Sequence, residues 1–334
     1  MTVQASNLES EQLPDPTAVA DPSKIAGRSP TKLALARFRQ DRLSMVSFVI
    51  VAIYLAIGIA APILVHFGVL DPFTLHQDLL NADTLPKGKF GGVSWDHPLG
   101  VEPGTGRDVL SRLVYGVTFS LAIALSATMI AIGLGTALGI ISGFSGGWTD
   151  SVIGRAVDLT LSFPQTLMLL ALSSLGVALV AMYVPGDDSD ALPNAVYVIL
   201  VLGLFGWPGV TRIIRGQVLS VREREFVDAA VLLGASRRRI YFKEILPNLW
   251  APLLVTFTLT MPLYISAEAA LSYLSVGIKP PTPTLGNILK GSVNYSQADF
   301  LFFFGPAFLI MLIVVSFNLL GDGIRDALDP KSAQ

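Results

Sequence analysis

Six long runs of apolar residues alternate with polar stretches along the chain. They cover residues 44–67, 117–143, 157–183, 195–214, 248–272 and 301–320. Each run reaches the roughly 20 mostly apolar residues that an α-helix needs to cross a bilayer. The pattern predicts an all-α polytopic membrane protein with six spanning helices. Proline and glycine inside these runs are compatible with spanning, since neighbouring helices can satisfy the backbone groups that they free.

Lysine and arginine predict the orientation, because cytoplasmic loops carry an excess of both. With the amino terminus inside, 17 of the 23 Lys and Arg residues fall on the cytoplasmic side and 6 outside. Both termini are therefore expected in the cytoplasm. About 40 mostly polar residues precede the first run, which is itself long, so we expect no cleavable signal peptide.

The polar stretches predict the remaining organisation. Residues 1–30 lack an apolar period and are expected to be a disordered cytoplasmic tail. Residues 31–43 mix leucine and phenylalanine with basic side chains, which is typical of an interfacial helix on membrane lipid. The six-span domain, residues 44–334, has an outer loop at 68–116, a cytoplasmic loop at 215–247 and a Pro-rich outer loop at 279–300.

Composition agrees with a membrane protein and excludes some chemistry. Hydrophobic residues make up 52% and charged residues 14% of the chain, against about a quarter charged in soluble domains. The chain has no cysteine, which excludes disulfides and thiolate sites. A net charge of −2 argues against a nucleic-acid partner.

A polar, basic segment, residues 225–247, separates the fourth and fifth apolar runs. Phe226, Ala229, Ala230 and Leu233 are spaced to share one face of a helix. Gly234 can adopt the left-handed conformation that ends a helix. This face is suited to a groove on a soluble cytoplasmic protein. The alternative is a solvated loop whose cations only follow the positive-inside rule.

A second short helix is expected directly after the first. Ser236 is a suitable N-cap residue, and Arg237, Arg238, Arg239 and Lys243 follow it. Pro247 would then lie near the first turn of the fifth span, where its missing N–H is tolerated.

Residues 228–248, DAAVLLGASRRRIYFKEILPN, resemble the cytoplasmic coupling loop of binding-protein-dependent ABC importer permeases. Asp228, Ala229, Ala230 and Gly234 keep the family spacing, although Asp228 replaces a glutamate and Glu244 an isoleucine. The resemblance implies that the following residues couple the chain to an ATPase: Glu225, Phe226, Asp228, Ala229, Ala230, Leu233, Gly234, Arg237, Arg238 and Pro247.

Three more blocks, residues 97–121, 267–289 and 319–331, resemble dipeptide and oligopeptide permeases of the C-subunit type. Val101-Glu102 departs from the family's Thr-Asp, and Tyr273 and Leu285 stand where Phe and Trp are common. The resemblance, from about residue 31 to 331, implies a type I importer fold in a bacterial inner membrane. It also implies a second permease, one or two ATPase chains holding ATP and Mg, and an extracytoplasmic peptide-binding protein.

Two alternatives to a peptide permease remain at this point. A nickel-chelate or haem importer permease of the same family has the same motifs. A stand-alone secondary transporter would instead need polar relays within its spans. No GxxxxGK[ST] loop is present, so we expect neither a nucleotide site nor another cofactor in this chain.

Other candidate sites rest on single residues or short motifs. Glu268 and Tyr273 are candidates for an outer gate or pathway, and a packing or capping carboxylate is the alternative for Glu268. Asp158 is either functional or merely solvated.

The stretch 143–147 fits the GxSxG pattern, but all three histidines are predicted outside, which excludes a catalytic triad. Gly135, Gly139 and Gly143 favour close helix packing, within the chain or against a second permease, and the alternative is that they are generic residues of a membrane helix. Acidic residues and histidines of the outer loop lack metal-ligand spacing, so no metal site is expected.

Overall fold

The computed structural model describes residues 30–184 and 191–328 of the chain, which fold into helices joined by loops. In chain order these are α1 (Pro30–Gln40), α2 (Arg42–His66), η2 (Gln77–Leu79), α3 (Val109–Ser145), α4 (Gly147–Ser162), α5 (Gln165–Ala171), α6 (Ser173–Tyr183), α7 (Ala191–Val221), α8 (Glu225–Leu232), α9 (Arg237–Arg239), η3 (Ile240–Ile245), η4 (Leu246–Leu249), α10 (Trp250–Tyr273), α11 (Leu285–Val293) and α12 (Phe300–Leu328).

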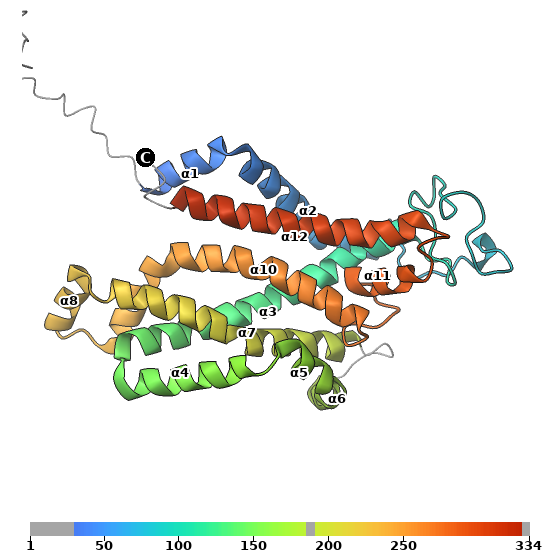
Figure 1. Cartoon of the computed structure of the whole chain (residues 1–334). Coiled ribbons are helices and arrows are strands. Elements are labelled where there is room, and N and C mark those ends of the chain that lie inside the picture. The colour runs from blue at the N-terminus through green and yellow to red at the C-terminus, as the bar shows by residue number, and fades with distance from the viewer. Residues whose placement is uncertain (1–29, 185–190, 329–334) are drawn as a thin grey trace, which may run out of the picture.

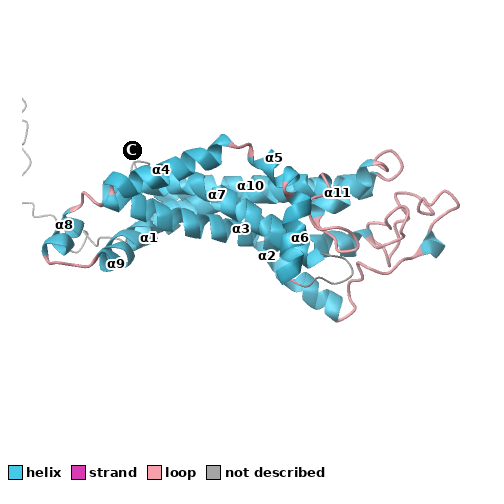
Figure 2. Cartoon of the chain, turned by 90° about the horizontal axis from the view of Figure 1, so that it is seen from below, coloured by secondary structure: helices cyan, strands magenta, loops and turns pink. Residues whose placement is uncertain are grey.

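The long helices form an elongated bundle whose two ends differ (Figure 1). At one end α8 projects beyond the bundle, and α1 and the last turns of α12 lie towards that same end. The long loop after α2 and the short helix α11 lie at the other end, as the perpendicular view in Figure 2 also shows. This arrangement agrees with the predicted topology, in which both termini and the segment 225–247 share one side of the membrane.

Within the described residues, five helices are long and apolar enough to cross a membrane: α2, α3, α7, the continuous segment Arg237–Tyr273 and α12. The pair α5 and α6, bent by 64° at Leu172, makes a sixth span when the two helices are counted as one broken span. The predicted third span, residues 157–183, therefore begins in the last turns of α4 and is interrupted at Pro164 and at Leu172. Phe163 has φ −95° and ψ 131°, because the ring of Pro164 disfavours helical geometry at the preceding residue.

Several helices extend beyond the apolar runs that predicted them. The carboxylate of Asp108 caps α3 by accepting the Ser111 N–H at 2.7 Å, so residues 109–116 are helical rather than loop. The fifth span begins at Arg237 instead of 248. Its start includes the π-helical η3 and the 3₁₀ turn η4 around Pro247, which accommodate the missing proline N–H.

The outer loop 279–300 contains α11, which the sequence did not predict. Thr284 and Asn287 cap it reciprocally: Thr284 Oγ1 accepts the Asn287 N–H, and Asn287 Oδ1 accepts the Thr284 N–H. The predicted disordered tail at 1–30 lies, except for Pro30 in α1, outside the described residues. Residues 31–40 are helical as expected, and their contact with lipid stays a prediction.

Glycines on α3 allow it to pack closely against α7. A Cβ atom at Gly135, Gly139 or Gly143 would lie 2.5 to 2.8 Å from the Cβ atoms of Val210, Ile214 and Val218, respectively. Only glycine fits this contact without a shift of the backbone. The glycine repeat therefore serves packing within the chain, which decides among the alternatives left by the sequence.

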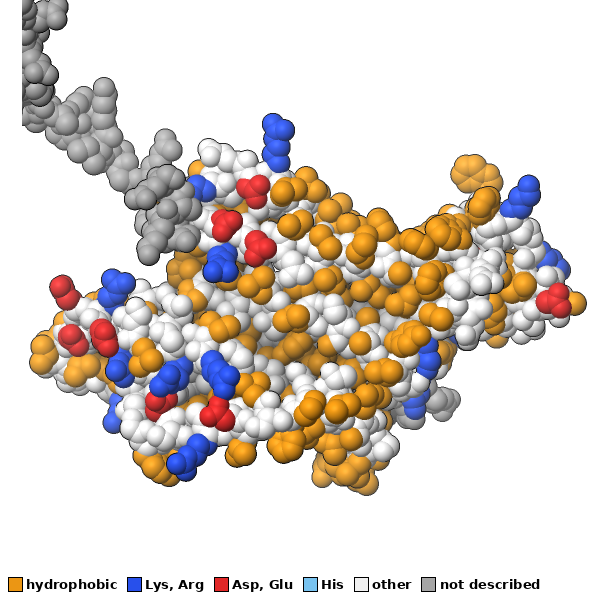
Figure 3. Space-filling view, in the orientation of Figure 1, with side chains coloured by type: hydrophobic (Ala, Val, Ile, Leu, Met, Phe, Trp, Pro, Cys, Tyr) orange, Lys and Arg blue, Asp and Glu red, His pale blue; other side chains and the backbone are white. Residues whose placement is uncertain are grey.

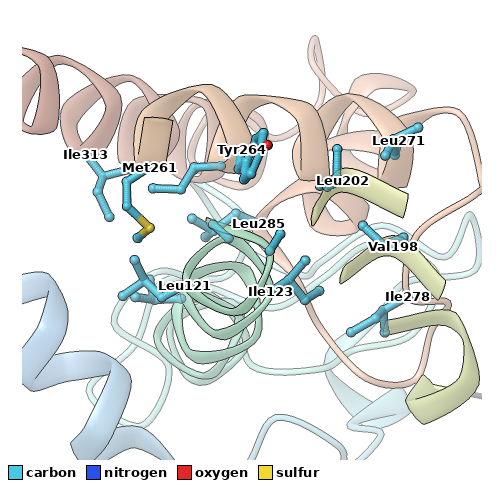
Figure 4. Packing of buried hydrophobic residues seen from close by; sticks show 14 of the residues in the cluster. Leu121, Ile123, Val198, Leu202, Met261, Tyr264, Leu271, Ile278, Leu285 and Ile313 are labelled. Atoms are coloured by element: carbon cyan, nitrogen blue, oxygen red, sulfur yellow. The ribbon is translucent and has the colours of Figure 1, made fainter. Parts of the chain in front are cut away.

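Two groups of buried apolar side chains hold the bundle together. The larger one joins α2, α3, α7, α10, α11 and α12, and Figure 4 shows Leu121, Leu202, Met261, Leu285 and Ile313 converging within it. The smaller one, here called the inner cluster, lies at the end of the bundle that carries α8. Its buried members are Ile140, Val210, Ile214, Val218, Val227, Ile240, Ile245 and Leu249.

Candidate functional site

Helix α8 ends as its sequence predicts. Gly234 has a φ of +75°, in the left-handed region. Its N–H donates to the carbonyl of Val231, and the Ala235 N–H donates to the carbonyl of Ala230, both at 3.0 Å. These two bonds form a Schellman motif, which satisfies carbonyls at the end of the helix. The chain therefore turns sharply after α8 and returns towards the bundle.

Val227 anchors α8 to the rest of the protein. Its side chain is 1% exposed and belongs to the inner cluster with residues of α3, α7 and η3. Ala230 is partly buried against the same cluster. From the sequence, Ala230 was predicted on the helix face that contacts a partner protein, and Val227 was not identified as important. Because α8 is anchored in this way, a force applied to it acts directly on the spans.

The opposite face of α8 is open. Phe226 is 42% exposed, and Leu232 and Leu233 are each 87% exposed. Glu225, Asp228 and Ala229 are exposed as well. Apolar side chains with this exposure at the end of a helical bundle are typical of an interaction surface. Leu232 was missed by the sequence analysis, since its position falls just outside the predicted stripe.

The segment after α8 carries the exposed cations. Ser236 caps α9, with Oγ accepting the Arg239 N–H at 3.4 Å, as predicted. Arg237 and Arg238 are exposed, as is Pro247 in η4. The hydroxyl groups of Tyr241 and Ser145 are 3.0 Å apart, which ties η3 to the inner end of α3. Ser145, the central residue of the GxSxG pattern, thus has a structural partner.

Two ion pairs connect α4 to α7 near the inner cluster. The Arg215 guanidinium donates to both carboxylate oxygens of Asp150, each at 2.6 Å, and Ser142 donates to the same carboxylate. Arg212 Nη2 donates to Asp158 Oδ1, also at 2.6 Å. Figure 3 shows acidic and basic side chains side by side over α4 and α7. Asp158 is therefore paired, although its carboxylate is largely exposed.

The Arg215 hydrogen bonds lower the pKa of the Asp150 carboxyl from 3.8 to about 2. The carboxylate is thus ionised throughout the physiological pH range. In the sequence, Arg212 and Arg215 contributed only to the excess of Lys and Arg predicted on the cytoplasmic side. Their partners lie far away in the chain, 65 residues in the case of Asp150, so no local pattern could have identified the pairs.

Glu268 lies inside the bundle with 1% of its surface exposed. Its carboxylate accepts hydrogen bonds from Ser120 of α3 and Ser272 of α10, both at 2.7 Å. Ser120 Oγ also accepts the Leu285 N–H of α11 at 3.2 Å. This geometry matches the alternative of a packing carboxylate. Tyr273 is 44% exposed, unlike the buried Glu268, and an outer-gate role stays a prediction for both.

Comparison with known proteins identifies the family. The sequence model of one protein family, the binding-protein-dependent transport system inner membrane component, matches residues 135–334. The chain belongs to this family. The model of the N-terminal transmembrane domain of oligopeptide transport permease C matches residues 29–86. The chain is accordingly a permease and a multi-pass protein of the inner membrane.

Similar sequences carry related names. The dipeptide transport system permease protein DppC of Alkalihalophilus pseudofirmus is 35% identical over 95% of both chains. The oligopeptide transport system permease protein OppC of Bacillus subtilis is 36% identical over 93% of both chains. This permease also resembles the structure of an inward-facing MetNI methionine ABC transporter, with a TM-score of 0.51 and 20% identity. That match covers 66% of this chain and 97% of the other, and it supports the type I importer fold.

Proposed function

We propose that this permease is one transmembrane subunit of an ATP-driven importer of dipeptides or oligopeptides. It forms the translocation pathway with a second permease, and it receives peptides from an extracytoplasmic binding protein. Cytoplasmic ATPase subunits dock on α8 and supply the energy. The names of the similar permeases support a peptide substrate.

One observation carries the proposed coupling: α8 is open on one face and anchored on the other. Leu232 and Leu233 are free for a partner, whereas Val227 lies in the inner cluster. Movement of a docked ATPase would displace α8 together with α7 and η3. The two ion pairs of α7 would extend the displacement to α4. Close-packed helices transmit such rigid-body movements.

Uptake measurements distinguish the possible substrates. A strain lacking this permease should lose uptake of labelled dipeptides and oligopeptides and regain it with the gene in place. Uptake of labelled nickel chelate and haem serves as the comparison. Loss of nickel-chelate or haem uptake, with peptide uptake unchanged, would contradict a peptide substrate. It would not contradict the assignment of this chain to an ATP-driven importer. Peptide uptake that persists in a strain lacking the ATPase subunits would contradict the proposal of an ATP-driven importer.

A further inference from the structure

An apolar groove of about 430 Å³ runs between α3 and η3. On α3 it extends from Met129 to Ile141, and on the other side Tyr241 and Phe242 line it. At 1.5 Å per residue, the α3 wall is about 18 Å long. Gly133 lies in this wall, and a Cβ atom there would meet nothing within 4 Å. The groove is therefore open along a spanning helix.

A basic cavity of about 400 Å³ adjoins the groove. It is lined by Arg238, Arg239 and Lys243 together with Ser236 and Phe242, and no acidic side chain of the described chain is in its lining. Phe242 lines both spaces and is 62% exposed. The apolar groove and the basic cavity are therefore neighbours on either side of Phe242, and together they make up the candidate site.

The cations belong to α9 and η3, next to α8, and the groove extends along α3 from Ile141 to Met129. Because the positive-inside rule predicts α8 and α9 on the cytoplasmic side, the cations are expected at the inner membrane surface and the groove within the bilayer. We propose that this site binds one anionic glycerophospholipid of the inner leaflet. An acyl chain lies in the groove, and the phosphate lies between Arg239 and Lys243.

Charge and shape together favour this ligand. An acyl chain matches an apolar groove of this length, and only a lipid joins such a chain to a phosphate at the membrane surface. The Arg239 guanidinium is suited to phosphate, since its planar set of N–H donors can form paired hydrogen bonds. Basic side chains beside a spanning helix on the cytoplasmic side are typical of sites for anionic lipid headgroups.

Native mass spectrometry of the full-length permease provides the test. The protein is purified in mild detergent with phosphatidylglycerol or phosphatidylcholine, and the lipids retained per chain are counted. We expect one retained phosphatidylglycerol and little phosphatidylcholine. Each cation near an anionic headgroup contributes about 1 kcal/mol. Arg239→Gln/Lys243→Gln should therefore weaken phosphatidylglycerol binding by about 30-fold.

The groove is tested separately from the charges. Gly133→Leu places a side chain in the open groove and should abolish retention of the lipid. Gly209→Leu is the matched control, because Gly209 also has open space around it and is not in the lining of the groove. Arg155→Gln/Arg325→Gln is the control for the loss of two exposed cations.

Three results would overturn the proposal. Equal retention of both lipids would exclude a site for anionic headgroups. Equal losses in the variants and their controls would show nonspecific binding. Cross-linking of a Gly133→Cys variant to the second permease in intact membranes would assign the groove to a subunit interface instead.

Discussion

Gly139 illustrates how single residues determine the packing of this permease. Its α-carbon faces Ile214 so closely that an added Cβ atom would lie 2.8 Å from the Ile214 Cβ. That atom is branched and fixed to the backbone, so it cannot move away without moving α7. The same geometry recurs one turn earlier at Gly135 and one turn later at Gly143.

Gly139→Val should therefore destabilise the permease. Overpacking of a close contact costs about 1–3 kcal/mol, and we expect a clear decrease in the melting temperature of the detergent-solubilised protein. Gly209→Val is the control, because its Cβ would meet no neighbouring atom within 4 Å. Equal melting temperatures for the Gly139→Val variant and the wild type would contradict the tight contact between α3 and α7.

The Asp150–Arg215 pair makes a prediction about pH. The pKa of Asp150 is lowered to about 2 in the folded protein. A lowered carboxyl pKa stabilises the fold above the unfolded value of about 3.9, and the stabilisation is lost as the pH falls towards 2. The stability advantage of the wild type over Asp150→Asn should therefore be constant above about pH 5 and shrink as the pH falls from 5 towards 2. An equal advantage at about pH 3 and pH 7 in thermal unfolding would contradict the lowered pKa.

Residues whose partners are close in sequence were predictable, and residues with distant partners were not. Gly234 and Ser236 act through bonds to neighbouring backbone groups, and the structure places both as their sequence context predicts. Val227, Asp150 and Arg215 act through other helices. Glu268 was recognised as an unusual carboxylate, but its serine partners on α3 and α10 were visible only in the fold.

At the scale of elements, α8 combines an anchored face with a free face. This division decides which substitutions can test docking on α8 without disturbing the helix itself. Ala230 is partly buried against the inner cluster, so Ala230→Arg would disturb α8 itself. Ala229 is exposed, so Ala229→Arg changes the free face alone.

Ala229→Arg should reduce ATPase association while the permease remains folded. Gly234→Val should do the same by another route, since a β-branched residue in the left-handed conformation is strained by about 1–2 kcal/mol. Co-purification of the ATPase subunits with tagged permease measures both effects. Arg155→Gln, on the exposed side of α4, is the control. Wild-type recovery of the ATPase with both variants would contradict docking on α8.

Hydropathy predicted the apolar part of the helices but not their breaks or extensions. The third span is broken because Pro164 and the bend at Leu172 interrupt it, and an apolar run does not reveal the angle. The polar start of α3 was assigned to a loop, since water-exposed helical turns carry no apolar signal. The short helix predicted after Ser236 proved continuous with the fifth span. Helix α11 was missed because its capping box uses asparagine at the third position in place of Glu or Gln.

At the scale of the whole molecule, the two ends of the bundle differ in chemistry. One end carries α8 and the cations of α9, and the other carries the long outer loop and α11 (Figures 1 and 2). A broad band of apolar side chains covers the bundle between them (Figure 3). This polarity is what an importer needs if the substrate arrives at one end and energy is applied at the other.

The most direct test of this account uses the absence of cysteine from the chain. Single-cysteine variants Leu232→Cys on α8 and Trp95→Cys in the outer loop, both at highly exposed positions, are treated with a thiol-to-amine cross-linker in native membranes. We predict that an ATPase subunit becomes linked to Leu232→Cys and not to Trp95→Cys. No link at Leu232→Cys, or an equal link at both positions, would contradict the account.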